Sequence, residues 1–342
     1  MSSRLQEFCG YYSNRLSYEE VASLVERVSG ERLLSDQKIG QIVSNKALEF
    51  SQEIYESTRI TLAKSNQDVV KVNPTVNIYQ PESKEILLFE DGIQVKGQKE
   101  QRQARNQLVR EGESLSELVT KTPAIITDIV LLQKATGEFE YIAAPIDAKG
   151  KDLLTLASVV KAKVIQEYGR KTFPLNLVAI TDGARTIRHR LLSIFGVAVT
   201  VVLDWYHLSK KLRELMSMIA VNKLEKVQHL KFLLSHLRQG KTTVALEYLK
   251  HQINAKNLDK WGELIGYLEK HQLEIINYEC RRRAGKTIGS GRMEKAVDLT
   301  VGQRQKNKGM SWRPNGSRAL SLLKVAELNG QWQQLWFPAL AA

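Results

Sequence analysis

The chain has 342 residues, of which 43% are hydrophobic and 25% are charged, as expected of a globular protein with two or three domains. Cys9 and Cys280 stand far apart, which excludes zinc-finger and disulfide-scaffold patterns and fits the reducing cytoplasm, and no apolar run is long enough to span a membrane. The net charge of +13 predicts a polyanionic partner, although a basic surface can also be inert.

Residues 1–72 carry two helical patterns and predict a helix-turn-helix-like segment. Residues 17–20 have the spacing of a capping box, and Gly30 ends the helix that they begin. Ser35 can cap a second helix, and we expect residues 46–68 to continue as a polar, helical connector. The outward side of the second helix carries polar side chains that could contact a DNA groove, namely Gln37, Lys38 and Gln41. An ordinary helical hairpin would give the same pattern.

Residues 73–207 alternate between apolar runs and turns, and they predict the first part of an α/β core. The expected order is strands at residues 86–95, 125–133 and 139–146, a helix at 153–168, a strand at 177–180, a helix closed by Gly196 and a strand at 197–203. The last two runs are apolar enough for parallel strands covered on both faces. Three antiparallel strands followed by strand–helix alternation are the arrangement of an RNase H-like, mixed five-stranded sheet.

Aspartates occupy unusual places in these strands. Asp91 lies near the centre of the first strand, where a buried acid is costly unless it lies at an edge, beside a cation or on a metal. Asp182 and Asp204 end the fourth and fifth strands, at the sheet edge where α/β proteins bind their ligands. Two carboxylates at one edge indicate a metal site. Alternatively, Asp182 only forms a turn with Gly183 and Asp204 only caps a helix.

Residues 208–284 show helical patterns throughout and predict an all-helical insertion. Its apolar stripes, from Leu212 to Ile219 and from Leu230 to Leu237, are typical of the core of a helix bundle. Residues 285–342 then complete the core with C-terminal helices. Glu294 stands in the first turn of one of them, either as a metal ligand or as simple helix-end stabilisation. The cations around it that could contact phosphate are Arg281, Arg282, Arg283, Lys286, Arg292, Arg304, Lys306 and Lys308.

Several local strings resemble the DDE transposases of bacterial insertion sequences, particularly the Mutator-like group. They are Phe89-Glu90-Asp91-Gly92, Ile180-Thr181-Asp182-Gly183-Ala184, Leu203-Asp204-Trp205-Tyr206-His207-Leu208, Gly289-Ser290-Gly291-Arg292-Met293-Glu294 and the run from Arg304 to Trp312. The Asp204-x-x-His207 pair matches the C/D-x-x-H signature of that group, which also places a helical insertion after the fifth strand. The resemblance extends from about residue 85 to the end of the chain.

The resemblance implies a transposase with an RNase H-like catalytic domain. Asp91, Asp182 and Glu294 would be its catalytic triad and would hold two Mg²⁺ or Mn²⁺ ions, with Asp91 between them. Water would cleave one DNA strand, and the resulting 3′-OH would then attack target DNA in the same site. The implied partners are the terminal inverted repeats of the element, target DNA and a second copy of the chain on that DNA, in the nucleoid.

Other roles implied by the resemblance have structural alternatives. Asp204 and His207 either orient DNA, brace the insertion against the sheet or form a plain structural pair. Trp312 either stacks on a base beside the cleavage point or belongs to the core. For the whole chain, the alternatives are a catalytically inactive, transposase-derived DNA-binding protein and an RNase H-like nuclease acting on RNA or hybrids.

Overall fold

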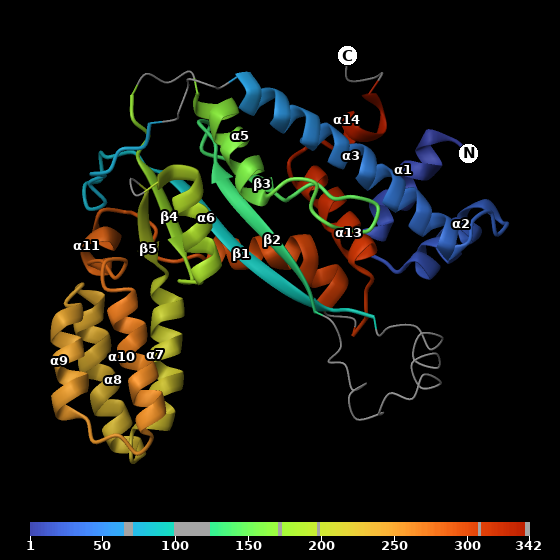
Figure 1. Ribbon diagram of the computed structural model, residues 1–342. Helices are drawn as coiled ribbons and strands as arrows, with labels where there is room; N and C mark the ends of the chain where they lie inside the picture. The colour runs from blue at the N-terminus through green and yellow to red at the C-terminus, as the bar shows by residue number, and fades with distance from the viewer. Residues whose placement is uncertain (65–70, 99–123, 170–172, 197–198, 307–308, 339–342) are drawn as a thin grey trace, which may run out of the picture.

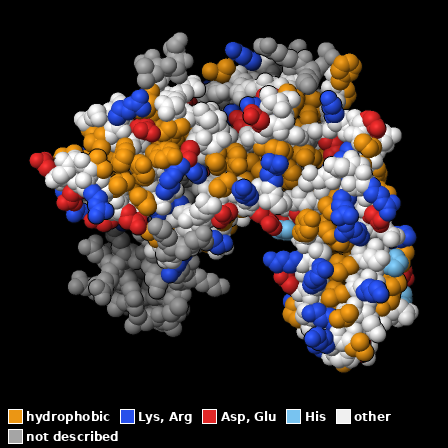
Figure 2. Space-filling view, turned by 180° about the vertical axis from the view of Figure 1, so that it is seen from behind, with side chains coloured by type: hydrophobic (Ala, Val, Ile, Leu, Met, Phe, Trp, Pro, Cys, Tyr) orange, Lys and Arg blue, Asp and Glu red, His pale blue; other side chains and the backbone are white. Residues whose placement is uncertain are grey.

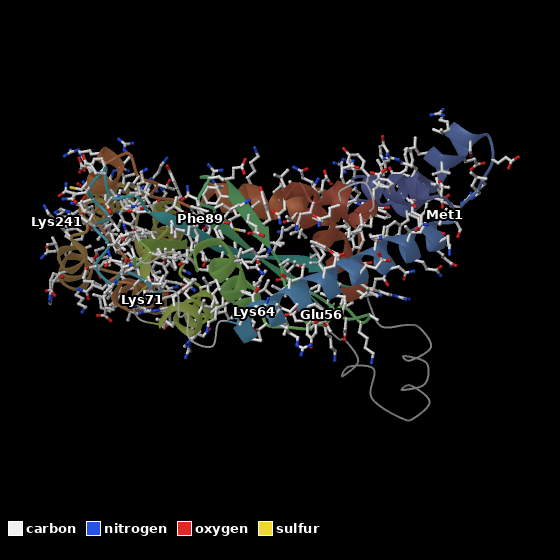
Figure 3. The ribbon with its side chains drawn as sticks, turned by 90° about the horizontal axis from the view of Figure 1, so that it is seen from above. Met1, Glu56, Lys64, Lys71, Phe89 and Lys241 are labelled. Atoms are coloured by element: carbon white, nitrogen blue, oxygen red, sulfur yellow. The ribbon has the colours of Figure 1, made fainter. Side chains whose placement is uncertain are left out.

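The computed structural model describes residues 1–64, 71–98, 124–169, 173–196, 199–306 and 309–338. A sheet with helices on both faces forms the middle of the molecule (Figure 1). The N-terminal helices lie at one end, marked by Met1 in Figure 3, and a bundle of helices lies at the other end, marked by Lys241. No helix in the described ranges is long and apolar enough to cross a membrane.

The sheet has five strands in the spatial order β3-β2-β1-β4-β5. Their bounds are β1 Ile86–Lys96, β2 Ala124–Gln133, β3 Phe139–Ile142, β4 Leu177–Thr181 and β5 Thr200–Leu203. The β1–β2 and β2–β3 pairs are antiparallel, whereas β1–β4 and β4–β5 are parallel. The mixed five-stranded α/β sheet and the order of its elements are therefore confirmed. β3 ends four residues earlier than expected, and residues 197 and 198 of the expected last strand lie outside the described ranges.

Alternating side chains of the strands build two apolar cores. Leu88, Leu132 and Ala179 point to one face, where they pack with α5 (Leu156–Tyr168) and α6 (Arg185–Phe195). Phe89 and Leu131 point to the other face, into a core shared with α12 (Gly291–Val297), the π-helix η2 (Asp298–Lys306) and α13 (Pro314–Leu328). Because neighbouring residues of a strand point to opposite faces, two adjacent acids on β1 meet different surroundings.

The N-terminal helices are α1 (Ser3–Ser13), α2 (Tyr18–Ser29) and α3 (Asp36–Lys64). The predicted capping box of Ser17 and Glu20 is present, and Gly30 ends α2 with a φ of 82°. The expected connector is helical as far as residue 64, because α3 continues through it as one helix of 29 residues that packs along α13 and α5. The end of the connector, residues 65–68, lies outside the described ranges. Gln37, Lys38 and Gln41 are exposed on α3, as expected.

The insertion between β5 and α12 is helical, as predicted, and forms a bundle (Figure 1). Its helices are α7 (Trp205–Ile219), α8 (Lys223–Arg238), α9 (Thr242–Gln252), α10 (Leu258–Lys270) and the short α11 (Tyr278–Arg283). Leu212, Met216, Leu233 and Leu237 are buried in the bundle core. The amide of Trp205 donates a hydrogen bond of 3.0 Å to the carbonyl of Ile288, so the two ends of the insertion meet. After η2 and α13, the short α14 (Trp332–Trp336) ends the described helices.

Candidate active site between the sheet and the helical insertion

Asp91 and its neighbour Glu90 lie on opposite faces of β1. Glu90 is buried beside α6, where Arg190 forms ion pairs with it and with Asp128. Asp91 points to the face covered by α12, and one of its carboxylate oxygens accepts a hydrogen bond of 2.7 Å from the amide of Gly92. From the sequence, only Asp91 was a candidate site residue. The signal that distinguishes Glu90 is a cation on a neighbouring helix, Arg190 of α6, which marks Glu90 as the structural acid.

Asp182 lies at the carboxyl end of β4, beside β1. Its Oδ1 accepts a hydrogen bond of 2.8 Å from the amide of Ala184, so it does form a turn with Gly183. Gly183 has a φ of 85°, and a Cβ there would lie 2.8 Å from the ring of His271, so a glycine is needed. The second carboxylate oxygen of Asp182 accepts no hydrogen bond from the described residues. The turn and a role as a ligand are therefore compatible.

Asp204 is buried and connects two parts of the site. One of its carboxylate oxygens accepts hydrogen bonds from the amides of Tyr206 and His207, at 2.5 and 2.9 Å, and thereby caps α7. The other accepts from the amide of Ser290 and, at 2.5 Å, from its hydroxyl group. Ser290 directly precedes α12, the helix that carries Glu294. Asp204 thus fixes the start of α12 against the start of α7, and its geometry is that of a brace.

Glu294 and His207 face each other from these two helices. Glu294 stands in the first turn of α12, and its side chain is 62% exposed. The distance between His207 Nε2 and Glu294 Oε1 is 3.2 Å. In Figure 2, acidic and histidine side chains lie together at the inner corner where the insertion meets the body of the molecule. The ring of His207 therefore contacts an acid of the expected triad, whereas its backbone amide donates to its signature partner, Asp204.

The surroundings of Asp91 shift its pKa in both directions. Burial raises the pKa of Asp91 above its ordinary value, and the hydrogen bond from Gly92 lowers it. The charges of Asp182 and Glu294 raise that pKa further, whereas His207 lowers it. Among the described residues, no Lys or Arg forms an ion pair with any of the three acids. The site therefore combines mutually repelling carboxylates with little compensating positive charge.

These carboxylates suit a hard divalent cation such as Mg²⁺ or Mn²⁺, which prefers oxygen ligands. Burial and, to a smaller extent, repulsion by the other acids raise the pKa of Asp91, and a bound cation would offset both. Within the described ranges, however, no three His, Cys, Asp or Glu side chains form a ready-made metal centre. Glu294 is turned toward His207, and its exposed side chain can adopt other rotamers. The chemistry of the donor set fits a metal, with the acids gathered near one another rather than already clustered.

Four residues expected to contact DNA are instead engaged within the fold, three of them buried and Lys286 partly buried. Arg281 is fully buried and pairs with Glu85 at 2.7 Å, because that acid lies under α11 and needs a partner. Lys286 pairs with the same carboxylate at 2.7 Å. Arg304 donates a hydrogen bond of 2.8 Å to the carbonyl of Ser13 and lies over the ring of Trp312, which is only 7% exposed. These four expectations are corrected: the side chains hold the structure together, and the core alternative for Trp312 is the right one.

The other expected cations that the structure describes lie at the surface. Arg282, Arg283 and Lys306 are exposed, although Arg283 pairs with Glu279. Arg292 is exposed on α12 and lies 4.6 Å from the centre of the Phe139 ring. Lys308 lies outside the described residues.

A small cavity adjoins the site on the side of the insertion. Its volume is about 230 Å³, and it is lined by Asp182, His207, Lys210, Lys211, Glu214 and Tyr267. The lysines and Tyr267 were not predicted from the sequence, because the helical patterns of α7 and α10 indicate only a bundle core.

Comparison of the chain with protein-family models, curated proteins and solved structures found no match.

Proposed function

We propose that this protein is a DDE transposase of a bacterial insertion sequence, with an RNase H-like catalytic core that cleaves and joins DNA strands. Asp91, Asp182 and Glu294 are its metal-binding triad. The observation that carries the proposal is the convergence of these acids, which are far apart in sequence, on one place. Parallel pairing of β1 with β4 brings Asp91 and Asp182 to one edge of the sheet. Glu294 lies 3.2 Å from His207, which lines a cavity together with Asp182.

The topology of the sheet supports this proposal. Two antiparallel pairs followed by two parallel pairs, in the order β3-β2-β1-β4-β5, make up the strand arrangement of RNase H-like domains. β1 pairs in parallel with β4, so Asp91 on β1 and Asp182 directly after β4 lie toward the same edge of the sheet. Glu294 follows a helical insertion, which is the chain order of the triad in the resembling family. Fold alone does not define an activity, so the acids carry the functional argument.

Each residue has a separate task in the proposed reaction. Two bound Mg²⁺ or Mn²⁺ ions supply activation of the attacking oxygen and stabilisation of the leaving oxygen. Asp91 and Asp182 are held by the strands of the sheet, and Glu294 is placed by the contact between Asp204 and Ser290. His207 holds the Glu294 carboxylate on the side of the insertion. Exposed cations, among them Arg282, Arg292 and Lys306, contact DNA phosphates, and the +13 charge favours encounter with DNA.

The test is strand cleavage by single variants of the triad. The substrate is supercoiled plasmid carrying the DNA that flanks the gene, incubated with Mn²⁺. Since losing a metal ligand removes several kcal/mol of transition-state stabilisation, we expect Asp91→Asn, Asp182→Asn and Glu294→Gln each to reduce cleavage by about 10³-fold. Binding of labelled DNA, measured by fluorescence anisotropy, stays within about twofold because these acids contact no phosphate directly.

Matched controls are Asp259→Asn and Glu247→Gln, which remove exposed acids from the bundle and leave cleavage unchanged. Binding of Mn²⁺ is measured separately by electron paramagnetic resonance, and it weakens in Asp91→Asn but not in Asp259→Asn. Full cleavage by any triad variant removes that residue from the site. A wild-type protein that binds DNA, does not bind Mn²⁺ and does not cut DNA would establish the inactive alternative. Cleavage confined to RNA–DNA hybrids would establish the nuclease.

A further inference from the structure

The cavity beside Asp182 is built from three elements. Asp182 comes from the end of β4 and Tyr267 from α10. The remaining lining residues, His207, Lys210, Lys211 and Glu214, all come from α7. Their spacing of three, four and seven residues places them on one side of that helix. The cavity therefore follows α7 away from the triad, and one of its walls is a carboxylate of the triad itself.

The cations of the cavity are not equivalent. Lys211 is already engaged, because its Nζ lies 2.7 Å from Glu263, an acid that it shares with Lys260. Lys210 is exposed and forms no ion pair with any described residue. Glu214 lies one turn further along α7, away from the sheet, and therefore leaves the part of the cavity nearest Asp182 to Lys210. An unpaired lysine beside a carboxylate site can neutralise an anion that the carboxylates alone would repel.

Tyr267, from α10, forms another wall of the cavity. Burial raises the pKa of its phenol, and the charges of Asp182, Glu274 and Asp204 raise it further, so the hydroxyl group keeps its proton and can donate a hydrogen bond. Its ring centre lies 4.8 Å from that of His271, which is buried and lies 2.5 Å from Glu274. One face of Tyr267 is therefore covered, and the ring has little freedom to move.

We propose that this cavity binds the sugar–phosphate unit next to the phosphate cleaved at Asp182, with Lys210 pairing with its phosphate and Tyr267 contacting its deoxyribose. This inference rests on the proposed function and specifies how one DNA strand passes the site. At about 230 Å³ the cavity is smaller than the roughly 300–1,000 Å³ of typical ligand clefts, so it suits one nucleotide unit rather than a stacked base pair. Its mostly charged lining suits a sugar–phosphate better than a base.

The test measures coupling between Lys210 and a single phosphate. The position at which the Mn²⁺-loaded protein cuts a duplex is first mapped. A set of uncut duplexes is then prepared, each with one phosphate beside that position replaced by a neutral methylphosphonate. Because a hydrogen bond to a charged group is lost, Lys210→Ala lowers kcat/KM about tenfold on the natural duplex. On the duplex whose contacted phosphate is neutral, the same variant has no further effect. The matched control, Lys231→Ala on α8, removes an exposed lysine outside the cavity and shows no such dependence on position.

If Lys210→Ala lowers kcat/KM by the same factor on the natural duplex and on every modified duplex, the inference is overturned, while the proposed triad is unaffected. If the wild-type protein cuts no DNA, the proposed function fails, and binding of an unmodified duplex from the DNA that flanks the gene, measured in Ca²⁺, then tests the cavity alone. A several-fold weaker affinity of Lys210→Ala than of Lys231→Ala would support the cavity as a phosphate site. Equal affinities of the two variants would overturn it.

Discussion

Glu90 and Asp91 are sequence neighbours whose side chains meet opposite surroundings. The carboxylate of Glu90 is buried with Arg190, and the charge of each is balanced by the other. Asp91 has no cation partner among the described residues and is exposed to the charges of two further acids. A buried acid with a partner contributes to the fold, whereas one among other acids is a candidate ligand. The difference arises from a one-residue step along β1, which sends the two side chains to opposite faces.

Asp204 is the residue with the most demanding set of hydrogen bonds in the site, since it accepts four from Tyr206, His207 and Ser290. In Asp204→Asn, an NH₂ group replaces one of the two carboxylate oxygens and cannot accept a hydrogen bond. Either the donors of Ser290 or the amides at the start of α7 then lose their acceptor. We expect a loss of about 2–3 kcal/mol in the free energy of unfolding, measured by urea denaturation. Because Glu294 is then less well placed, we expect the proposed DNA cleavage to fall about tenfold or more in kcat with little change in KM.

Ser290→Ala is the graded comparison, because it removes only the hydroxyl donor and keeps the backbone amide bond to Asp204. Its loss of stability is expected to be about 1 kcal/mol. Unchanged kcat in Asp204→Asn would show that the start of α12 needs no brace for activity.

At the scale of elements, α11 is fastened to the segment before β1 by a buried ion pair. Arg281 on α11 pairs with Glu85, donates a further hydrogen bond of 3.2 Å to the carbonyl of Ile78, and is fully buried. Its neighbour Arg282 is exposed on the same short helix. The two arginines look identical in sequence but differ in role, because only one faces the carboxylate of Glu85.

Replacing each arginine by methionine separates the two roles. Arg281→Met leaves Glu85 buried with only Lys286 as partner, and we expect it to lower the free energy of unfolding by about 3 kcal/mol. Arg282→Met changes that free energy by less than about 0.5 kcal/mol and weakens DNA binding. Thermal denaturation and anisotropy measure the two effects. An equally stable Arg281→Met variant would show that the buried pair does not fasten α11.

At the scale of the whole molecule, an ion pair joins the N-terminal helices to the rest of the fold. Arg15, which follows α1, pairs with Glu327 at the end of α13. Burial raises the pKa of Glu327, but hydrogen bonds from Arg15 and Lys324 outweigh it, so the pKa lies below its ordinary value. A lowered pKa means that the charged acid stabilises the folded state above the ordinary pKa, and that this contribution disappears as the pH falls through the lowered value.

The pH dependence of Glu327→Gln follows from this sign. At pH 7 we expect the variant to be less stable than the wild type by about 1–2 kcal/mol. The difference shrinks as the pH falls from about 5 to below the lowered pKa, since the wild-type carboxyl group is then protonated as well. Calorimetric unfolding at several pH values measures the difference. The exposed Glu26→Gln serves as control, and a difference that persists unchanged in acid would contradict the role of the charge.

The sequence was sufficient for the sheet, the helical insertion and the capping box, because these depend on local periodicity and on short-range hydrogen bonds. It was not sufficient for Arg281, Lys286 and Arg304, because burial of a cation depends on a distant partner such as Glu85. Asp182, Asp204 and Glu294 could be selected as candidates from their places in strands and helices. The contact of Asp204 with Ser290, and the cavity between α7 and α10, depend on how distant elements pack and have no local signal.

The bundle departs from the core at Trp205 and rejoins it at Ile288, and a backbone hydrogen bond links these two residues. Because the two ends of the insertion already touch, the number of residues between them does not set the distance between β5 and α12, the elements that the insertion connects. Shortening or exchanging the outer part of the bundle is therefore expected to leave β1 and β4, and the aspartates at their edge, where they are.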